Sequence, residues 1–432
     1  MAMGAIAFMD RTNISIAGIE MGREFGIDDT RLGWVFSAFL IGYAGFQIPA
    51  GVLARRFGPR RILTFGVLWW GVFTALTAAA PSGAPAALLM LILIRFALGA
   101  GEAVMYPSAN QFVERWIPIA ERGRANGIIF GGVGLGTGLA PPLLTALILR
   151  WGWRVSFWFC ATLGVLAGAV WLFAARNTPE EHPWVSEREL EHIAGGRGDA
   201  ERSLPAAQGG RMGEAGQVPR QAPRDLPSRV PWRKIFSSKD ILAVSASYFT
   251  YGYVSWIFFS WFYIYLAQVR GLSLKTSALY SILPFLAMTV GCLIGGVASD
   301  WLGRHVSMRA GRSYLPCFAL VLTAVLLSAG SRAHSAQTAS LVLAGGAGAL
   351  YLSQSCFWSV TADFAGQYAG VVSGAVNMCC QIGAAVTASV TPLIAAHFGW
   401  IASFLTASIL AAVGGLAWLM VDPHARLARA GG

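Results

Sequence analysis

The stretch Gly51-Val52-Leu53-Ala54-Arg55-Arg56-Phe57-Gly58-Pro59-Arg60-Arg61 joins two long apolar runs, residues 32–54 and 62–80. Each run is long enough for a transmembrane helix, which needs about 20 mostly apolar residues. The four arginines between the runs are costly to place in hydrocarbon, so they indicate a short loop in water. The stretch therefore predicts a helical hairpin that crosses a membrane twice.

Similar apolar runs fill most of the chain. Of the 432 residues, 55% are hydrophobic and only 12% are charged, which is too apolar for a soluble protein. The runs are 2–20, 32–54, 62–80, 86–112, 125–149, 155–175, 241–267, 277–299, 313–330, 338–360, 368–395 and 400–421. We therefore predict an all-α polytopic membrane protein with twelve transmembrane helices.

The first run is not a typical signal peptide. It has no basic segment before it, it carries charge at its middle, and no convincing cleavage site follows it. We expect this run to remain in the mature protein. Few residues precede its charged centre, which is compatible with a longer natural N-terminus.

The middle of the chain differs sharply in composition. Residues 176–237 are rich in Gly, Pro, Arg and Ala and lack an apolar period, which predicts a flexible cytoplasmic linker. Within it, Ser186 followed by Glu189 three residues later predicts a capped, short surface helix. The predicted domains are an N-terminal six-helix half at 1–175, the linker at 176–237, and a C-terminal six-helix half at 238–432.

The basic residues give the orientation. If both termini are cytoplasmic, the cytoplasmic segments hold 23 Lys and Arg residues and the external loops hold 7. This distribution follows the positive-inside rule. The net charge of +11 therefore reflects membrane topology, and we expect no nucleic-acid partner.

The sequence has no pattern typical of an enzyme. We find no catalytic His or Ser constellation, cofactor motif or metal-ligand cluster, so we predict no cofactor and no metal. Six cysteines are scattered through apolar segments without C-x-x-C spacing: Cys160, Cys292, Cys317, Cys356, Cys379 and Cys380. We interpret them as small hydrophobic residues and not as a disulfide framework. We expect a monomer in the lipid bilayer.

The basic turn has a counterpart in the second half. Gly296-Val-Ala-Ser-Asp300-Trp-Leu-Gly303-Arg304 follows the eighth run, and both turns place two glycines seven residues apart. This repeat resembles the turn pattern G-x-x-x-D-R-x-G-x-R-R of the major facilitator superfamily. Asp300 matches its acidic position, whereas Arg55 and Trp301 depart from it. The resemblance implies two six-helix halves that alternate access, with Gly51, Gly58, Gly296, Asp300 and Gly303 in the conformational turns.

Further segments resemble one group of that superfamily, the anion:cation symporters. They are 33–39, 42–51, 95–107 and 179–190. The group includes bacterial sugar-acid transporters and is related to sialic acid and vesicular glutamate transporters. The resemblance implies that Arg11 contacts the substrate and that Asp10 and Glu102 take part in proton coupling.

Four acidic or basic residues lie deep inside predicted spans, away from the ends. Asp10 and Arg11 are adjacent in the first run, and Arg95 and Glu102 share one face of the fourth because they are seven residues apart. Charges at membrane depth normally face a bundle interior or a watered cavity. Arginine suits a carboxylate because it stays protonated and offers a planar fork. Two structural alternatives are an Asp10–Arg11 pair at the end of a span, and a pair between Arg95 and an acid of another span.

Other candidate contacts are neutral. Tyr43 and Gln47 are four residues apart in the second run, as are Asn377 and Gln381 in the eleventh, although Tyr43 could equally be a core aromatic. The predicted substrate-binding residues are Arg11, Tyr43, Gln47, Arg95, Trp358, Ser359, Asn377 and Gln381. Four aromatic residues of the seventh run either flank the substrate or anchor the helix at the interface: Tyr248, Tyr251, Trp256 and Trp261.

The fifth run combines small residues with paired prolines. Its glycines allow close helix packing, and Pro141-Pro142 is expected to disturb the helix where the halves pivot. This stretch is similar to a motif of exporters in the superfamily. The predicted function is proton-coupled uptake of a small organic anion across the bacterial cytoplasmic membrane, with a sugar acid (hexonate, hexuronate or aldarate) or another carboxylate as substrate. The alternatives are a proton-coupled exporter of amphipathic compounds and, more remotely, a non-transporting membrane receptor.

Overall fold

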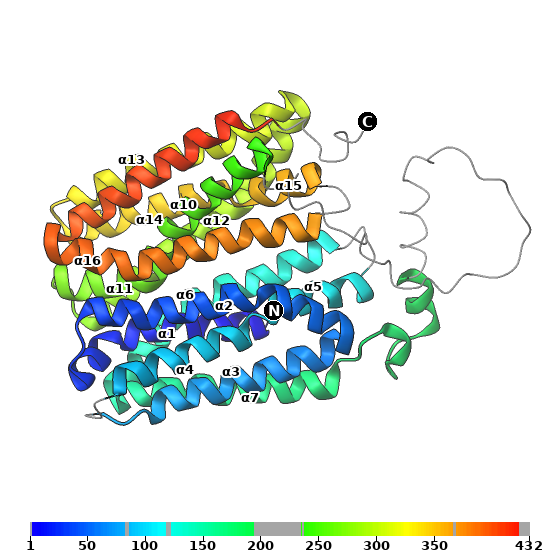
Figure 1. Ribbon diagram of the computed structural model, residues 1–432, viewed down its shortest axis with the longest axis horizontal. Coiled ribbons are helices and arrows are strands. Elements are labelled where there is room, and N and C mark those ends of the chain that lie inside the picture. Colours follow the sequence, from blue (N-terminus) through cyan, green and yellow to red (C-terminus); the bar gives the residue numbers. More distant parts are fainter. Residues whose placement is uncertain are drawn as a thin grey trace, which may run out of the picture.

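The computed structural model describes residues 2–82, 86–117, 122–193, 235, 237–365 and 369–422. These residues are almost entirely helical, and the long helices run roughly side by side (Figure 1). The first group comprises α1 (Ala2–Phe25), α2 (Asp29–Phe57), α3 (Pro59–Ala79), α4 (Ala87–Glu102), α5 (Met105–Trp116), α6 (Arg122–Trp151) and α7 (Trp153–Ala174). The second comprises α10 (Lys239–Ser260), α11 (Phe262–Ile264), η3 (Tyr265–Val269), α12 (Leu274–His305), η4 (Ala310–Tyr314), α13 (Leu315–Arg332), α14 (Ala336–Leu352), α15 (Gln354–Ala365), α16 (Ala369–Ala417) and η6 (Trp418–Met420).

The twelve predicted apolar runs all correspond to helices, which confirms the predicted fold class. Nine helical segments within the described ranges are long and apolar enough to cross a membrane. One of these holds two spans, because α16 kinks at Gly399, where φ is 81°. Helix α1 is not among the nine, since its charged residues lower its mean hydropathy.

The fourth and tenth runs are each divided, where the sequence predicts continuous helices. The fourth breaks at Ala103 and Val104 between α4 and α5. Pro107 explains this break, because proline has no N–H to donate to the Ala103 carbonyl and its ring crowds that position. The tenth breaks at Ser353, whose hydroxyl donates to the Leu350 carbonyl. By contrast, α6 continues through Pro141 and Pro142.

The helix bundle has two ends, which we name by their loops. The linker face is the end from which the segment after α7 leaves, and the far face is the opposite end, at the turn of residues 26–28 (Figure 1). On the linker face, Pro179–Glu181 forms a short 3-10 helix, η2. The predicted cap is confirmed, since Glu189 N–H donates to Ser186 Oγ at 3.3 Å and Ser186 N–H to Glu189 Oε2 at 3.4 Å. Residues 194–234, which make up most of the predicted linker, lie outside the description, and the predicted domain boundaries at 175/176 and 237/238 stay predictions.

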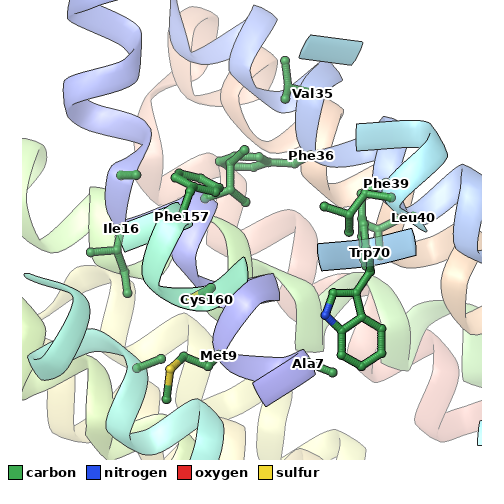
Figure 2. Close-up of a cluster of buried hydrophobic side chains, with 14 of the residues drawn as sticks. Ala7, Met9, Ile16, Val35, Phe36, Phe39, Leu40, Trp70, Phe157 and Cys160 are labelled. Carbon is green, nitrogen blue, oxygen red and sulfur yellow. The ribbon is translucent and has the colours of Figure 1, made fainter. Parts of the chain in front are cut away.

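The core of the first group is formed by side chains from α1, α2, α3 and α7 (Figure 2). Trp70, Phe157 and Cys160 belong to this core and are 1%, 0% and 1% exposed. All six cysteines lie in described residues and are free, so the prediction that they form no disulfide framework is confirmed.

Glycines let neighbouring helices touch within each group. A Cβ at Gly42 of α2 would overlap the Phe96 carbonyl oxygen of α4, and a Cβ at Gly99 would overlap the Phe39 carbonyl oxygen. In the second group, Gly291 and Gly295 of α12 approach carbonyl groups of α14 in the same way. The two groups therefore repeat the same kind of close packing.

This packing predicts an effect of Gly42→Ala on stability. The new methyl group would meet backbone, which cannot rotate away, so α2 and α4 must separate at a cost of about 1–3 kcal/mol. The matched control is Gly45→Ala on the same helix, where a Cβ has nothing within 4 Å. Thermal unfolding in detergent, followed by tryptophan fluorescence, should show a lower Tm for Gly42→Ala only. Equal Tm values for the two variants would contradict this account of the contact.

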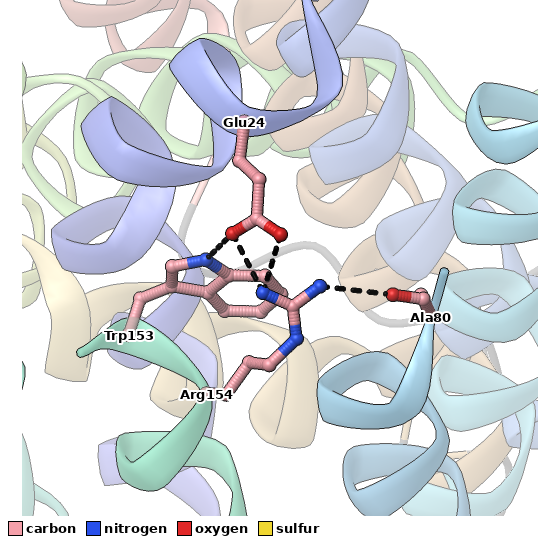
Figure 3. Close-up of polar contacts among 4 residues, drawn as sticks. All are labelled: Glu24, Ala80, Trp153 and Arg154. Carbon is pink, nitrogen blue, oxygen red and sulfur yellow. Dashed lines mark hydrogen bonds and ion pairs between the residues drawn. The ribbon is translucent and has the colours of Figure 1, made fainter. Parts of the chain in front are cut away.

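A polar clamp joins three helices at the far face (Figure 3). The Glu24 carboxylate accepts hydrogen bonds from Trp153 Nε1 and from Arg154 Nη1, each at 2.6 Å. Arg154 Nη2 also donates to the Ala80 carbonyl at 3.1 Å, which ties the ends of α1, α3 and α7 together. The hydrogen bonds from Arg154 hold the pKa of Glu24 below its usual range.

The clamp should stabilise the protein in a pH-dependent way. Because the folded pKa of Glu24 is lowered, its contribution is present above the unfolded value of about 4.3 and is lost as the pH falls through the folded value. The side chains are about one third exposed, so we expect the ion pair to contribute about 0.5–1 kcal/mol to the free energy of unfolding. Glu24→Gln should lower Tm at pH 7, and the difference from wild type should shrink below pH 4.5. The control, Glu20→Gln on the same helix, removes an acid that makes none of the clamp's contacts and should leave Tm at pH 7 unchanged. A pH-independent effect of Glu24→Gln would refute the assignment.

Candidate substrate site

The four ionisable residues predicted within spans are all buried. Asp10, Arg11, Arg95 and Glu102 are 2%, 7%, 1% and 1% exposed. Two lie on α1 and two on α4. They therefore form one desolvated cluster inside the first helical group, near its interface with the second.

The closest contact in this cluster is between Arg11 and Glu102. Arg11 Nε donates to Glu102 Oε1 at 2.6 Å, and both side chains are almost fully buried. Arg11 thus pairs with an acid of α4 and not with its neighbour Asp10. Arg11 Nη2 and Glu102 Oε2 have no hydrogen-bond partner among the described residues.

Aromatic rings surround the Arg11 guanidinium. Its Cζ atom lies 4.5 Å from the ring centroids of Phe8 and Tyr43 and 5.5 Å from that of Phe39. A guanidinium over a ring face is attracted by the ring quadrupole, which favours the charged form in an apolar setting. Tyr43 therefore serves as an aromatic neighbour of the predicted anion-binding residue.

Asp10 points toward α3. Its Oδ2 atom accepts a hydrogen bond from Thr74 Oγ1 at 2.8 Å, and Oδ1 has no hydrogen-bond partner within the described chain. Sequence reasoning did not find Thr74, because a single threonine in an apolar run gives no signal of its partner. Asp10 is close enough to Arg95 and Arg11 for electrostatic interaction.

Arg95 is a buried cation without an ion-pair partner in the described residues. Its Nε and Nη1 atoms make no hydrogen bonds there, and its Cζ atom lies 5.0 Å from the Phe39 centroid. The alternative of a tight pair between Arg95 and an acid of another span is therefore not what the structure shows.

A small cavity lies between the two helical groups at Arg11 and Arg95. Both arginines line it, together with four aromatic residues, Phe36, Phe39, Trp256 and Phe259. The cavity has room for on the order of one water molecule, so the groups are closed around it. A substrate could enter only after the groups move apart.

The cavity is closed toward the far face by contacts between the two groups. Ser37 Oγ donates to the Ala385 carbonyl at 2.6 Å and lies 2.7 Å from Ser389 Oγ. Trp261 Nε1 donates to the Ala388 carbonyl at 3.1 Å. A Cβ at Gly33 would overlap that same carbonyl oxygen, so α2 and α16 are in backbone contact.

Two of the predicted neutral residues meet toward the linker face. Asn377 Nδ2 of α16 donates to Gln47 Oε1 of α2 at 2.9 Å, which links the two groups. Gln381 is 7% exposed, and its Oε1 atom is without a partner in the described structure. Trp358 is 41% exposed and packs edge-on against Tyr248, and Ser359 follows it in α15. Neither Trp358 nor Ser359 lines the cavity at Arg11.

Several aromatic residues at the interface were missed or left ambiguous by the sequence. Tyr106, the second residue of α5, packs against the cores of both groups. Of the seventh run, Trp256 lines the cavity and Trp261 closes it. Tyr248 accepts a hydrogen bond from Gln354 Nε2 at 3.2 Å, a contact within the second group. The position of Tyr106 within segment 95–107 was the available signal.

The turns on the linker face have different contacts in the two groups. In the first, Gly58 has a φ of 85° between α2 and α3, and Gln111 donates to the Gly51 carbonyl at 3.1 Å. In the second, Asp300 and Arg312 form an ion pair at 3.3 Å. Near that turn, a Cβ placed on Gly296 would lie 4.0 Å from Ser355 Cβ, and one placed on Gly303 would lie 3.7 Å from Met308 Sδ. The Arg55 side chain lies outside the description.

The backbone contact at Gly33 predicts a conformational effect. Gly33→Ala should separate α2 from α16 and open the far face, because the new methyl group would meet the Ala388 carbonyl. Spin labels at Arg23→Cys and Lys275→Cys, which are exposed on opposite groups, should report a longer distance. Gly138→Ala, with nothing within 4 Å, is the control. An unchanged distance distribution would show that this contact does not hold the far face closed.

Two helical groups that enclose a buried, charged site at their interface are the construction of a secondary transporter. The chain belongs to the Major Facilitator Superfamily, whose sequence profile matches residues 1–388. This membership confirms the family resemblance found in the sequence and agrees with the prediction that the protein is not an enzyme.

Two curated relatives and one solved structure are similar to the chain, the structure in fold alone. The chain is 31% identical over 427 residues to a probable sulfoacetate transporter of Cupriavidus necator, covering 97% of this chain and 91% of the relative. It is 29% identical over 324 residues to a probable galactarate/D-glucarate transporter of Escherichia coli, covering 74% and 68%. A crystal structure of a bacterial homolog of the human lysosomal transporter Spinster, inward-facing and occupied, superposes with a TM-score of 0.75 at 16% identity, covering 96% and 94%.

Proposed function

We propose that this protein is a proton-coupled transporter that takes up a small organic anion. The observation that carries the proposal is the buried ion pair of Arg11 and Glu102, in which Arg11 also lines the cavity between the two groups. Arg11 supplies the fixed cation for the anion. Glu102 supplies the site for the proton.

Coupling follows from competition for one guanidinium. When a substrate anion binds Arg11, it displaces the Glu102 carboxylate, which then lies without a partner in a site shielded from water. A buried, unpaired charge is costly, so Glu102 takes up a proton as the anion binds. When the anion leaves, Glu102 loses the proton and pairs with Arg11 again.

Asp10 has a supporting part in the proposed mechanism. It keeps a hydrogen bond to Thr74, and its second oxygen is unpaired in the described structure. Asp10 is 2% exposed, and because burial favours the neutral form of a carboxyl group, it is the second acid in the site that can hold the proton alongside Glu102. The rocking of the two groups would then expose the site to each face in turn.

The named relatives support an anion as cargo. One is a probable sulfoacetate transporter and another a probable galactarate/D-glucarate transporter, and both substrates are small organic anions. We place this chain in the bacterial cytoplasmic membrane as a monomer, with the linker face and both termini on the cytoplasmic side. The two arginines beside the cavity favour anions over the amphipathic compounds of the exporter alternative.

Transport assays on purified protein test this function. In proteoliposomes, wild type should accumulate an organic anion when an inward pH gradient is imposed. Arg11→Ala should abolish binding and uptake. Glu102→Gln should keep counterflow exchange but lose proton-driven accumulation, because its side chain cannot exchange a proton.

The controls separate coupling from folding. Glu20→Gln removes an acid from the same bundle away from the cluster and should accumulate normally. Anion accumulation that ignores the pH gradient in wild type would refute the coupling. Normal accumulation by Glu102→Gln would remove that residue from the proton pathway.

A further inference from the structure

Arg95 is a buried cation to which the proposed mechanism assigns no ligand. It is 1% exposed, and its Nε and Nη1 atoms have no hydrogen-bond partner in the described part of the chain. A buried charge with unmet donors is costly unless something pairs with it. Arg95 lines the cavity, so a ligand there can reach those donors.

Arg11 and Arg95 are close enough for one short ligand to reach both. The Cζ atoms of Arg11 and Arg95 lie 5.5 Å and 5.0 Å from the centroid of the same ring, Phe39. These two distances together set an upper limit on the separation of the two guanidinium groups. Arg11 Nη2 is unpaired as well, so each arginine presents at least one buried donor.

The remaining cavity wall offers little for a hydroxylated chain. Besides the arginines and four aromatic rings, it contains Ile14, Ser15 and Ser260. The Ser15 hydroxyl already donates to the Ser260 carbonyl at 2.7 Å. Hydroxyl groups of a six-carbon sugar acid would therefore be buried here with few partners, which is unfavourable.

The amides that could read hydroxyl groups lie elsewhere. Gln47 and Asn377 are hydrogen-bonded to each other at 2.9 Å and do not line this cavity. Every described transmembrane residue of the second group that borders the cavity is also uncharged: Trp256, Phe259 and Ser260. The recognition of charge therefore depends on the two arginines of the first group.

We infer that the cargo is a short anion with two acidic groups and few hydroxyls, which bridges Arg11 and Arg95. One acidic group is a carboxylate, and the other is a second carboxylate or a sulfonate. This inference rests on the proposed function, since it takes Arg11 as the anion-binding residue. It narrows the substrate class away from polyhydroxy sugar acids.

Binding to the purified wild-type protein is the first test. Isothermal titration calorimetry should give at least about tenfold tighter binding of sulfoacetate and succinate than of acetate and galactonate, because two charge-assisted contacts replace one. Arg95→Gln should weaken the binding of sulfoacetate by about tenfold or more and change the binding of acetate by less than about threefold. Arg95→Lys keeps the charge, so its affinity for sulfoacetate should fall between those of wild type and Arg95→Gln.

The outcomes separate this inference from the proposed function. Binding of no organic acid by wild type would overturn both. If galactonate binds as tightly as sulfoacetate or more tightly, the inference alone is overturned. The same holds if Arg95→Gln loses equal affinity for acetate and for sulfoacetate. If Arg95→Gln fails to fold, the wild-type affinities and Arg95→Lys still decide.

Discussion

The buried ion pair between Arg11 and Glu102 is the interaction on which the account depends. At 2.6 Å and almost without exposure, it holds a guanidinium and a carboxyl group where bulk water cannot reach them. Removing one partner from such a pair typically costs about 3–5 kcal/mol, because the other charge stays buried. In the proposed mechanism, an anion that replaces Glu102 would change the protonation of the site, so that anion binding and proton uptake would be linked.

The packing around this pair keeps it buried. Gly42 and Gly99 bring α2 and α4 into backbone contact, which holds Glu102 of α4 beside the aromatic residues of α2. Gly33 then brings α2 against α16 of the other group and closes the far face. Small residues thus position the charged cluster and also form the contact that must open for transport.

Much of the fold could be predicted from the sequence, because length and hydropathy decide which segments cross a membrane. The capping pair of Ser186 and Glu189 was equally readable, since its geometry is local. The break after Glu102 was not predicted, although Pro107 was visible, because the apolar run continues through it. The candidate site was readable by residue type, but its pairings were not: sequence spacing cannot show that Arg11 meets Glu102, that Asp10 meets Thr74, or that Arg95 lacks an ion-pair partner among the described residues. These facts depend on how separate helices pack.

Proton uptake on anion binding tests the central claim most directly. Purified protein in weakly buffered detergent solution would be mixed with a saturating organic anion, and the pH change would be followed with an indicator dye. The account predicts that wild type takes up protons as the anion binds and that Glu102→Gln binds the anion with little or no uptake. Anion binding by wild type without proton uptake, or the same uptake by Glu102→Gln, would contradict it.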